Sequence, residues 1–229
     1  MADTQKPTVA ELEKQIGGLK RRVKRQRMVG YYNGLLDGYL LSLGPDDIIV
    51  DCGANVGEIS ARMAASGAQV HAFEPDPWTF ERLERSTKDL DNVTCIQAGV
   101  GAEAGEFTLY RSSDWDDRPK RASVASSIVA DMRDVDDSAE GISVSVIDLP
   151  AWLEEKIAEG HRIGLVKIDI EGAELDLMEA IMDKGLPHKI GLILVETHEK
   201  QLPQEADRFA ALRERAKDFP EGSINLDWI

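Results

Sequence analysis

Cysteine is scarce in this chain of 229 residues, which contains only Cys52 and Cys95. Both lie in apolar segments with the character of strands, so they suit reduced, buried thiols better than a disulfide framework or a zinc site. Long apolar runs are lacking as well, since none approaches the roughly 20 residues that a helix needs to cross a bilayer. The stretch from Met1 to Gln15 also lacks the apolar core of a cleavable signal. We therefore expect a cytoplasmic protein with no integral membrane segment.

Basic residues are outnumbered, with 27 Lys and Arg against 42 Asp and Glu, which gives a formal net charge of −15. Proteins that bind phosphate backbones normally present a basic face, so we expect no nucleic acid substrate. A hydrophobic share of 42% and a charged share of 30% are ordinary for a soluble globular protein. The length fits one domain with a small extension.

The amino-terminal region departs from this acidic character, because six of the eight residues from Lys20 to Arg27 are basic. Apolar residues spaced alternately by three and four predict an amphipathic helix there: Val9, Leu12, Ile16, Leu19 and Val23. Three interpretations stay open, namely a solvated helix face, an arm that forms a homodimer or docks on its own domain, and a weak peripheral contact with anionic lipid headgroups. We expect residues 1–44 to form a helical extension and residues 45–229 the main domain.

The most informative stretch is an apolar segment that ends at Asp51 and Cys52 and runs into a turn containing Gly53 and Gly57. In parallel α/β sheets, ligands bind at the carboxyl ends of the strands, where a glycine-rich turn lets the ligand approach the backbone. A second apolar segment ends at Glu74, 23 positions after Asp51. This is near the roughly 20 positions expected for an acid that accepts hydrogen bonds from ribose hydroxyls. The sequence therefore predicts a nucleoside pocket at the ends of two consecutive strands.

The composition of the turn favours S-adenosylmethionine over a dinucleotide. A dinucleotide fingerprint beginning at Gly53 would place its next two glycines at Asn55 and Glu58, and neither is glycine. Asp51 would also repel a pyrophosphate, whereas a carboxylate suits the α-ammonium and sulfonium of S-adenosylmethionine. The alternative interpretation is that the glycines make only a tight turn and that Glu74 only caps a strand.

We expect three parts of the cofactor to meet three groups of residues. The methionine part would lie on Asp51 and the turn, the ribose on the Glu74 region, and the adenine beside the end of a third strand. The expected cofactor-binding residues are Asp51, Gly53, Ala54, Asn55, Gly57, Glu74, Pro75, Gln97, Ala98 and Asp169.

Strand-like and helix-like segments alternate through the main domain, which predicts an α/β fold with a doubly wound, mostly parallel sheet. Expected strands are 48–52, 69–74, 93–97, 107–110, 142–147, 163–170, 190–196 and an edge strand within 223–229. Expected helices are 31–43, 57–66, 77–90, 149–159, 173–183 and 204–217. The segment from Arg111 to Ser138 is unusually long for a connection, and its Trp115, Ile128 and Val129 favour a substrate-covering loop.

Acidic residues and a histidine follow the last two long strands: Asp169, Glu171, Glu196 and His198. Because parallel strands end at one edge of the sheet, these side chains are candidates for substrate orientation, general-base catalysis or binding of a divalent metal. We expect Asp169, Glu196 and His198 to be the catalytic residues, without deciding which is the base. The alternative is that Asp169 and Glu171 cap the following helix.

These motifs resemble the FkbM family of S-adenosylmethionine-dependent methyltransferases. The resemblance rests on residues 50–57, 72–76 with Phe80 and Leu83, 147–149, 166–174 and 195–198. It implies a class I methyltransferase (Rossmann-like) fold and O-methylation of a hydroxyl on a sugar, glycolipid or natural product. The chain departs from the family pattern at Cys52, where a small or aliphatic residue is usual, and at Ser86, where we would expect Asn.

Two rival functions remain for this sequence. The first is a noncatalytic S-adenosylmethionine-binding or scaffold protein of the same fold, which would bind the cofactor but transfer no methyl group. The second is a nicotinamide-dependent dehydrogenase, which Asn55 and Glu58 disfavour.

Overall fold

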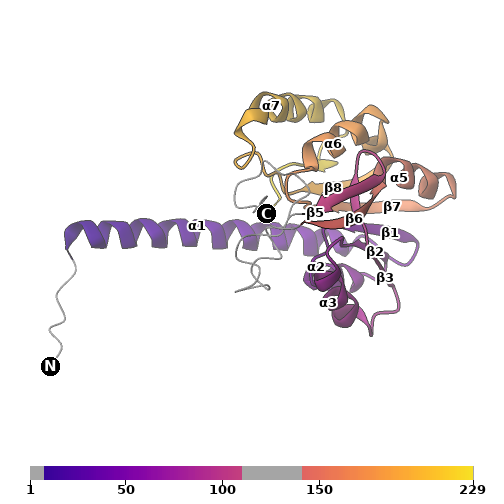
Figure 1. The fold of residues 1–229 in the computed structure, drawn as a ribbon, viewed down its shortest axis with the longest axis horizontal. Helices are drawn as coiled ribbons and strands as arrows, with labels where there is room; N and C mark the ends of the chain where they lie inside the picture. The colour runs from indigo at the N-terminus through magenta and orange to yellow at the C-terminus, as the bar shows by residue number, and fades with distance from the viewer. Residues whose placement is uncertain (1–7, 110–140, 229) are drawn as a thin grey trace. The chain divides into compact units, whose positions relative to one another are not determined.

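The computed structural model describes residues 8–109 and 141–228 (Figure 1). Its contacts divide the chain into two compact units, one ending at Leu41 and the other running from Ser42 to Trp228. The predicted substrate-covering loop from Arg111 to Ser138 lies outside the described residues.

The first unit is built on one long helix, α1 (Val9–Leu40). Thr8 and Glu11 form a capping box at its start, where each side chain accepts a hydrogen bond from the other residue's backbone N–H. The sequence predicted two helical segments here, and the structure joins them into a single helix of 32 residues. The predicted apolar seam, from Val9 to Val23, is exposed along its length. Among the described residues, no helix is long and apolar enough to cross a membrane.

The second unit contains a six-stranded sheet in the order β3-β2-β1-β7-β8-β9, and every neighbouring pair is parallel. The strands are β1 (Asp47–Cys52), β2 (Gln69–Phe73), β3 (Val93–Ile96), β7 (Arg162–Ile168), β8 (Ile190–Val195) and β9 (Ile224–Asn225). The chain adds strands outward from β1 through β2 to β3, and then returns to the other side of β1 with β7. The switch point therefore lies between β1 and β7, where open α/β sheets bind their ligands.

Helices cover both faces of this sheet (Figure 1). One face carries α2 (Glu58–Ala64) and α3 (Pro77–Thr87), and the other carries α5 (Leu149–Ala158), α6 (Glu174–Asp183) and α7 (Ala206–Arg215). The core on the second face joins β1, β7 and β8 to these three helices, as in the cluster of Val50, Val166, Ile193, Leu153 and Met178. Burial on both faces explains why the central strands read as continuous apolar runs. The predicted doubly wound α/β class is confirmed.

A separate three-stranded sheet has the order β4-β6-β5, with β4 (Gly99–Gly101), β5 (Gly105–Leu109) and β6 (Ile142–Asp148). β4 pairs parallel with β6, whereas β5 pairs antiparallel with it. The sequence predicted β5 and β6 but missed β4, which is three residues long and has glycine at both ends.

Both cysteines are free thiols, as predicted, and Cys52 is fully buried in β1. Burial, followed by the neighbouring charge of Asp51, raises the pKa of the Cys52 thiol well above its usual range. A thiol that stays protonated is a poor nucleophile and a poor metal ligand. Cys52 therefore packs in the core, and we assign it no chemical role.

Candidate functional site

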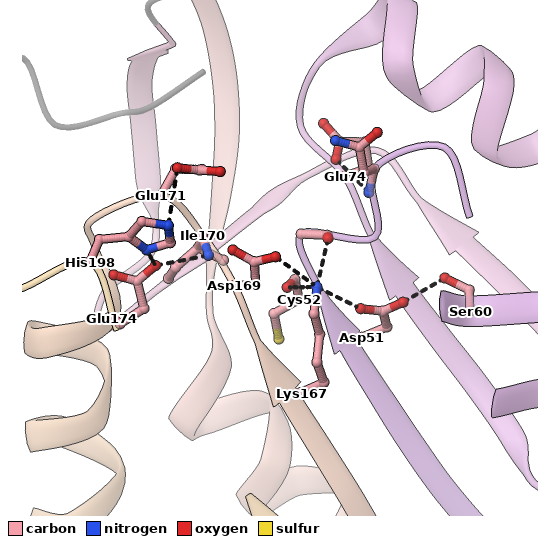
Figure 2. Close-up of polar contacts among 12 residues, drawn as sticks. Asp51, Cys52, Ser60, Glu74, Lys167, Asp169, Ile170, Glu171, Glu174 and His198 are labelled. Atoms are coloured by element: carbon pink, nitrogen blue, oxygen red, sulfur yellow. Dashed lines mark hydrogen bonds and ion pairs between the residues drawn. The ribbon is translucent and has the colours of Figure 1, made fainter. Parts of the chain in front are cut away.

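The predicted site residues lie at the carboxyl ends of five adjacent parallel strands, and Figure 2 labels four of these residues, Asp51, Glu74, Asp169 and His198. Asp51 is the last residue but one of β1, Glu74 follows β2, and Asp169 follows β7. Glu196 and His198 follow β8. Gln97 and Ala98 directly follow β3, so they lie at the same edge. Strands far apart in the sequence thus bring the predicted cofactor and catalytic residues to one edge of the sheet.

The turn after β1 packs tightly against the end of β7. A Cβ atom on Gly53, whose φ is +75°, would lie 1.8 Å from the carbonyl oxygen of Asp169. The backbone N–H groups of Gly53 and Ala54 both donate to the carbonyl of Phe73, at 3.0 and 2.9 Å. Gly53 is therefore required by the close approach of two strand ends, whether or not a ligand lies nearby.

The same turn approaches α3 at its far end. A Cβ atom on Gly57, whose φ is +87°, would lie 2.5 Å from Oγ of Ser86. That hydroxyl donates to the carbonyl of Val56 at 2.6 Å, so it fastens the turn to α3. Ser86 departs from the family pattern, and here its small side chain fits beside the glycine.

Glu74 links the turn after β1 to the end of β2. Its carboxylate accepts hydrogen bonds from the backbone N–H groups of Asn55, at 3.0 Å, and Asp76, at 2.9 Å. The side chain is buried, which raises the pKa of Glu74 to about 7 despite these two hydrogen bonds. An ionised carboxylate has lone pairs beyond those used by two donors, so Glu74 can also accept from ribose hydroxyls.

A buried lysine occupies the switch point. Nζ of Lys167 lies 3.3 Å from a carboxylate oxygen of Asp51 and 3.5 Å from one of Asp169. It also donates to the carbonyl oxygens of Gly53, at 2.9 Å, and Cys52, at 3.3 Å. Burial would lower the pKa of Lys167, but the two carboxylates outweigh it and hold the pKa above its usual range. Lys167 is therefore charged in the folded protein.

Asp51 is turned into this interior cluster. Its side chain is fully buried, and its second carboxylate oxygen accepts a 2.6 Å hydrogen bond from Oγ of Ser60. The sequence predicted that Asp51 would face the cofactor's ammonium group, whereas the structure places its carboxylate against Lys167. Sequence reasoning gave Lys167 no role, although a lysine in the otherwise apolar end of a buried strand was an available signal.

His198 is held between two carboxylates (Figure 2). Its Nδ1 lies 2.9 Å from Glu174, and its Nε2 lies 3.2 Å from Glu171. Burial would lower the pKa of His198, but the hydrogen bond and charge of Glu174, with those of Glu171 and Asp169, raise it to about 9. Without a bound cation the imidazole is therefore protonated at neutral pH and has no lone pair to accept a proton, and His198 could ligate a cation only after losing this proton. The geometry favours a carboxylate over His198 as the base.

Glu174 anchors this second cluster. It is fully buried and accepts hydrogen bonds from the backbone N–H groups of Ile170, at 3.0 Å, and Gly172, at 3.0 and 3.1 Å. Neither Asp169 nor Glu171 is the N-cap residue of the following helix, so the capping part of the alternative interpretation is not borne out, whereas an interaction with the helix dipole stays a prediction. The N-cap residue of α6 is Ala173, and no side chain caps it.

Asp169 lies between the two clusters in Figure 2. Together with Glu171 and His198 it offers three ligand atoms within 4.8 Å of one another, a spacing that could hold a divalent cation. Glu196 is half-buried at the end of β8, and burial, then the charge of Asp169, raises its pKa. A carboxylate with a raised pKa accepts a proton more readily near neutral pH, so Asp169 and Glu196 together could serve proton abstraction.

A glycine-containing turn and the buried acid Glu74 thus lie beside the switch point of a parallel α/β sheet, which is where such sheets bind their ligands. The family model described as "Methyltransferase FkbM domain" matches residues 51–219. The chain therefore belongs to the FkbM methyltransferase family, and the predicted resemblance is confirmed.

Curated relatives agree with this family. "Methyltransferase 1" of Beauveria bassiana is 32% identical over 158 residues, which cover 61% of each protein. The "Hexuronic acid methyltransferase AglP" of Haloferax volcanii is 26% identical and covers 80% of this chain and 70% of its own length. The "31-O-demethyl-FK506 methyltransferase FkbM" of Streptomyces tacrolimicus is 29% identical over 69% of this chain and 68% of its own length.

A solved structure of a methyltransferase FkbM from Methylobacillus flagellatus KT aligns with 75% of this chain and 39% of that chain, at 18% identity and a TM-score of 0.42. The chain thus spans about three fifths of the length of the fungal relative and less of the solved bacterial protein.

Proposed function

We propose that residues 45–229 form an S-adenosylmethionine-dependent O-methyltransferase that acts on a hydroxyl of a sugar, glycolipid or natural product. Family membership supports methyl transfer, and relatives named for a hexuronic acid and for a demethylated FK506 support a hydroxyl-bearing acceptor. The observation that carries the proposal is the position of the Glu74 carboxylate, bonded to the turn after β1 at the same sheet edge as Asp169.

The cofactor would lie along this edge. The backbone from Gly53 to Gly57 would receive the methionine part, Glu74 the ribose hydroxyls, and Gln97 with Ala98 the adenine. Asp51 would act on the cofactor through its charge, which Lys167 partly offsets, because its carboxylate is buried.

Methyl transfer would be an in-line displacement, in which the acceptor oxygen bonds to the methyl carbon as the carbon–sulfur bond breaks. Alignment of the two reacting groups supplies most of the acceleration in such reactions. The acceptor hydroxyl must also lose its proton, and a positioned base typically contributes about 10² to 10⁴ in rate. Asp169 and Glu196 are the candidates that the geometry favours for this proton.

The direct test is a panel of hydroxyl compounds incubated with methyl-labelled cofactor, with and without a chelator. We expect label on the oxygen of one class of acceptor. A loss of turnover on chelation that Mg²⁺ or Mn²⁺ restores would support a cation at Asp169, Glu171 and His198. Cofactor binding without transfer to any acceptor would favour the noncatalytic alternative.

The ribose role of Glu74 predicts a change in cofactor affinity. Glu74→Gln removes a charged acceptor, and hydrogen bonds to charged groups contribute about 1.5–3 kcal/mol. We therefore expect the dissociation constant for S-adenosylmethionine at pH 8 to rise about 10- to 100-fold, as measured by calorimetry. Glu81→Gln, which changes an exposed carboxylate on α3, is the matched control and should leave the affinity unchanged.

The raised pKa of Glu74 adds a pH dependence. Wild-type affinity should fall as the pH drops through about 7, because protonation removes the charged acceptor, whereas Glu74→Gln should bind weakly at every pH. The charged groups acting on Glu74 are Asp76 and Lys167, and neither reverses this sign. Protonation of Glu74 does not itself favour unfolding, since an acid with a raised pKa in the folded state makes folding more favourable at lower pH. If the cofactor affinity of wild type and of Glu74→Gln changed with pH in the same way, Glu74 would not be the residue that binds the ribose.

A further inference from the structure

The ammonium of Lys167 contacts both of the loops that the proposed reaction uses. Cys52 and Gly53, whose carbonyl oxygens accept its hydrogen bonds, begin the turn after β1. Asp169, which lies 3.5 Å from the same nitrogen, begins the turn after β7. Asp51 and Lys167 are register partners on the adjacent strands β1 and β7, so the contact sits directly at the switch point.

Stability does not account for a lysine at this position. Lys167 is only 3% exposed, and the four residues before it in β7, Ile163 to Val166, are apolar or glycine and buried. Desolvating a buried ion pair offsets most of its attraction, and replacing such a pair by apolar residues is often neutral or stabilising. A Val or Leu would suit the core as well. The presence of a lysine is better explained by the carbonyl and carboxylate groups that its ammonium contacts.

Asp169 is the member of this cluster whose side chain is accessible to a ligand. The side chain of Asp51 is fully buried and that of Lys167 is 4% exposed, whereas that of Asp169 is 28% exposed. The backbone of Asp169 is also fixed, because its N–H donates to the carbonyl of Cys52 at 3.1 Å and its own carbonyl packs on Gly53. Lys167 then pairs with one oxygen of this carboxylate at 3.5 Å.

We propose that Lys167 is a positioning residue for methyl transfer, whose ammonium aims the Asp169 carboxylate at the reacting groups and ties the cofactor turn to the end of β7. This inference rests on the proposed function and assigns a role to a residue that does not touch the substrate itself. A compact ammonium with three donors fits a site that offers two carbonyls and two carboxylates, whereas a planar guanidinium would need more room.

The experiment compares Asp51→Asn with the double variant Asp51→Asn/Lys167→Met. The double variant removes both charges, so it avoids a buried carboxylate without a partner, which would cost several kcal/mol and could prevent folding. If Lys167 positions Asp169, kcat of the double variant should fall a further ~10²-fold below that of Asp51→Asn, the scale of loss expected from misplacing a reacting group. KM for the acceptor and the calorimetric affinity for S-adenosylmethionine should change by less than about tenfold between the two.

Arg162→Met/Asp47→Asn is the control for a purely structural ion pair, and as a double variant it also leaves no buried carboxylate without its partner. Arg162 lies at the other end of β7 and pairs with the buried carboxylate of Asp47 on β1, so the same two strands lose a charge pair away from the site. Its melting temperature should fall while kcat stays within twofold of wild type. A double variant that turns over as fast as Asp51→Asn would show that Lys167 only neutralises Asp51, and would overturn the proposal.

Crystal structures of Asp51→Asn and of the double variant give a readout that needs no acceptor. The Asp169 carboxylate should keep its orientation in the single variant and rotate or adopt several orientations in the double variant. An unchanged Asp169 in the double variant would contradict the positioning role even if the proposed methyl transfer proved wrong. If the wild-type protein instead methylates no acceptor while Asp169 moves as expected, the proposed function fails and the positioning of Asp169 stands.

Discussion

Asp169→Asn should lower kcat for methyl transfer by about 10² to 10⁴, while the dissociation constant for S-adenosylmethionine changes less than about tenfold. Asn keeps the size of the side chain and an oxygen that can face Lys167, so the fold and the cofactor turn should persist. It cannot take a proton from the acceptor hydroxyl. The measurements are kcat under saturating cofactor and acceptor, and cofactor affinity by calorimetry.

The matched control is Asp176→Asn, which changes an exposed carboxylate on α6 that pairs with Arg208. It should leave both kcat and cofactor affinity at wild-type values. Glu196→Gln, measured beside Asp169→Asn, identifies the base, because the residue that accepts the proton shows the larger loss of kcat. Equal losses of kcat and cofactor affinity in Asp169→Asn would mean that Asp169 serves to hold the cofactor and is not the base.

Gly53→Ala should destabilise the protein and abolish cofactor binding. A methyl group at this position would lie 1.8 Å from the Asp169 carbonyl oxygen, and the neighbouring atom is backbone that cannot move aside easily. The left-handed conformation costs a non-glycine residue about 1–2 kcal/mol, and overpacking typically adds about 1–3 kcal/mol. For a domain of this size, a loss of about 2–5 kcal/mol corresponds to a fall in melting temperature of roughly 5–15 °C.

Gly185→Ala separates the cost of the left-handed conformation from the cost of overpacking. Gly185 also has a positive φ, +65°, but nothing lies within 4 Å of the position its Cβ would take. It should therefore show only the conformational cost, a few degrees in melting temperature, with normal cofactor binding. If Gly53→Ala loses no more stability than Gly185→Ala and still binds the cofactor, the close approach of the turn to β7 is not needed for the site.

The sequence predicted the central sheet because its strands are buried on both faces. β1, β7 and β8 are continuous apolar runs between turns, and that pattern identifies buried parallel strands without any knowledge of their neighbours. β4 was not predicted, because a strand of three residues with two glycines shows no alternation of apolar and polar residues. The single helix α1 was predicted as two segments, since its internal glycines disfavour a helix that the structure nevertheless continues.

The sequence predicted the acids and the histidine that follow the strands, but it predicted neither Lys167 and Glu174 as members of the site nor any of the pairings. Acids at strand ends can be recognised from the sequence alone, because parallel strands end at one edge. The contact of Lys167 with Asp51 depends on the register between two strands whose contacting residues are about 115 positions apart, and no local pattern encodes it. The same holds for His198 and Glu174, whose contact sets the charge of the imidazole and hence disfavours it as the base.

The central claim is that the site at the switch point accepts an adenosyl sulfonium cofactor and no pyrophosphate-bearing coenzyme. Titration calorimetry of the wild-type protein with S-adenosylmethionine, its demethylated product and NADH tests this most directly. The account predicts one site per chain for the first two compounds, weakened by Glu74→Gln, and no heat of binding for NADH. Saturable binding of NADH with none for S-adenosylmethionine or its product would contradict it.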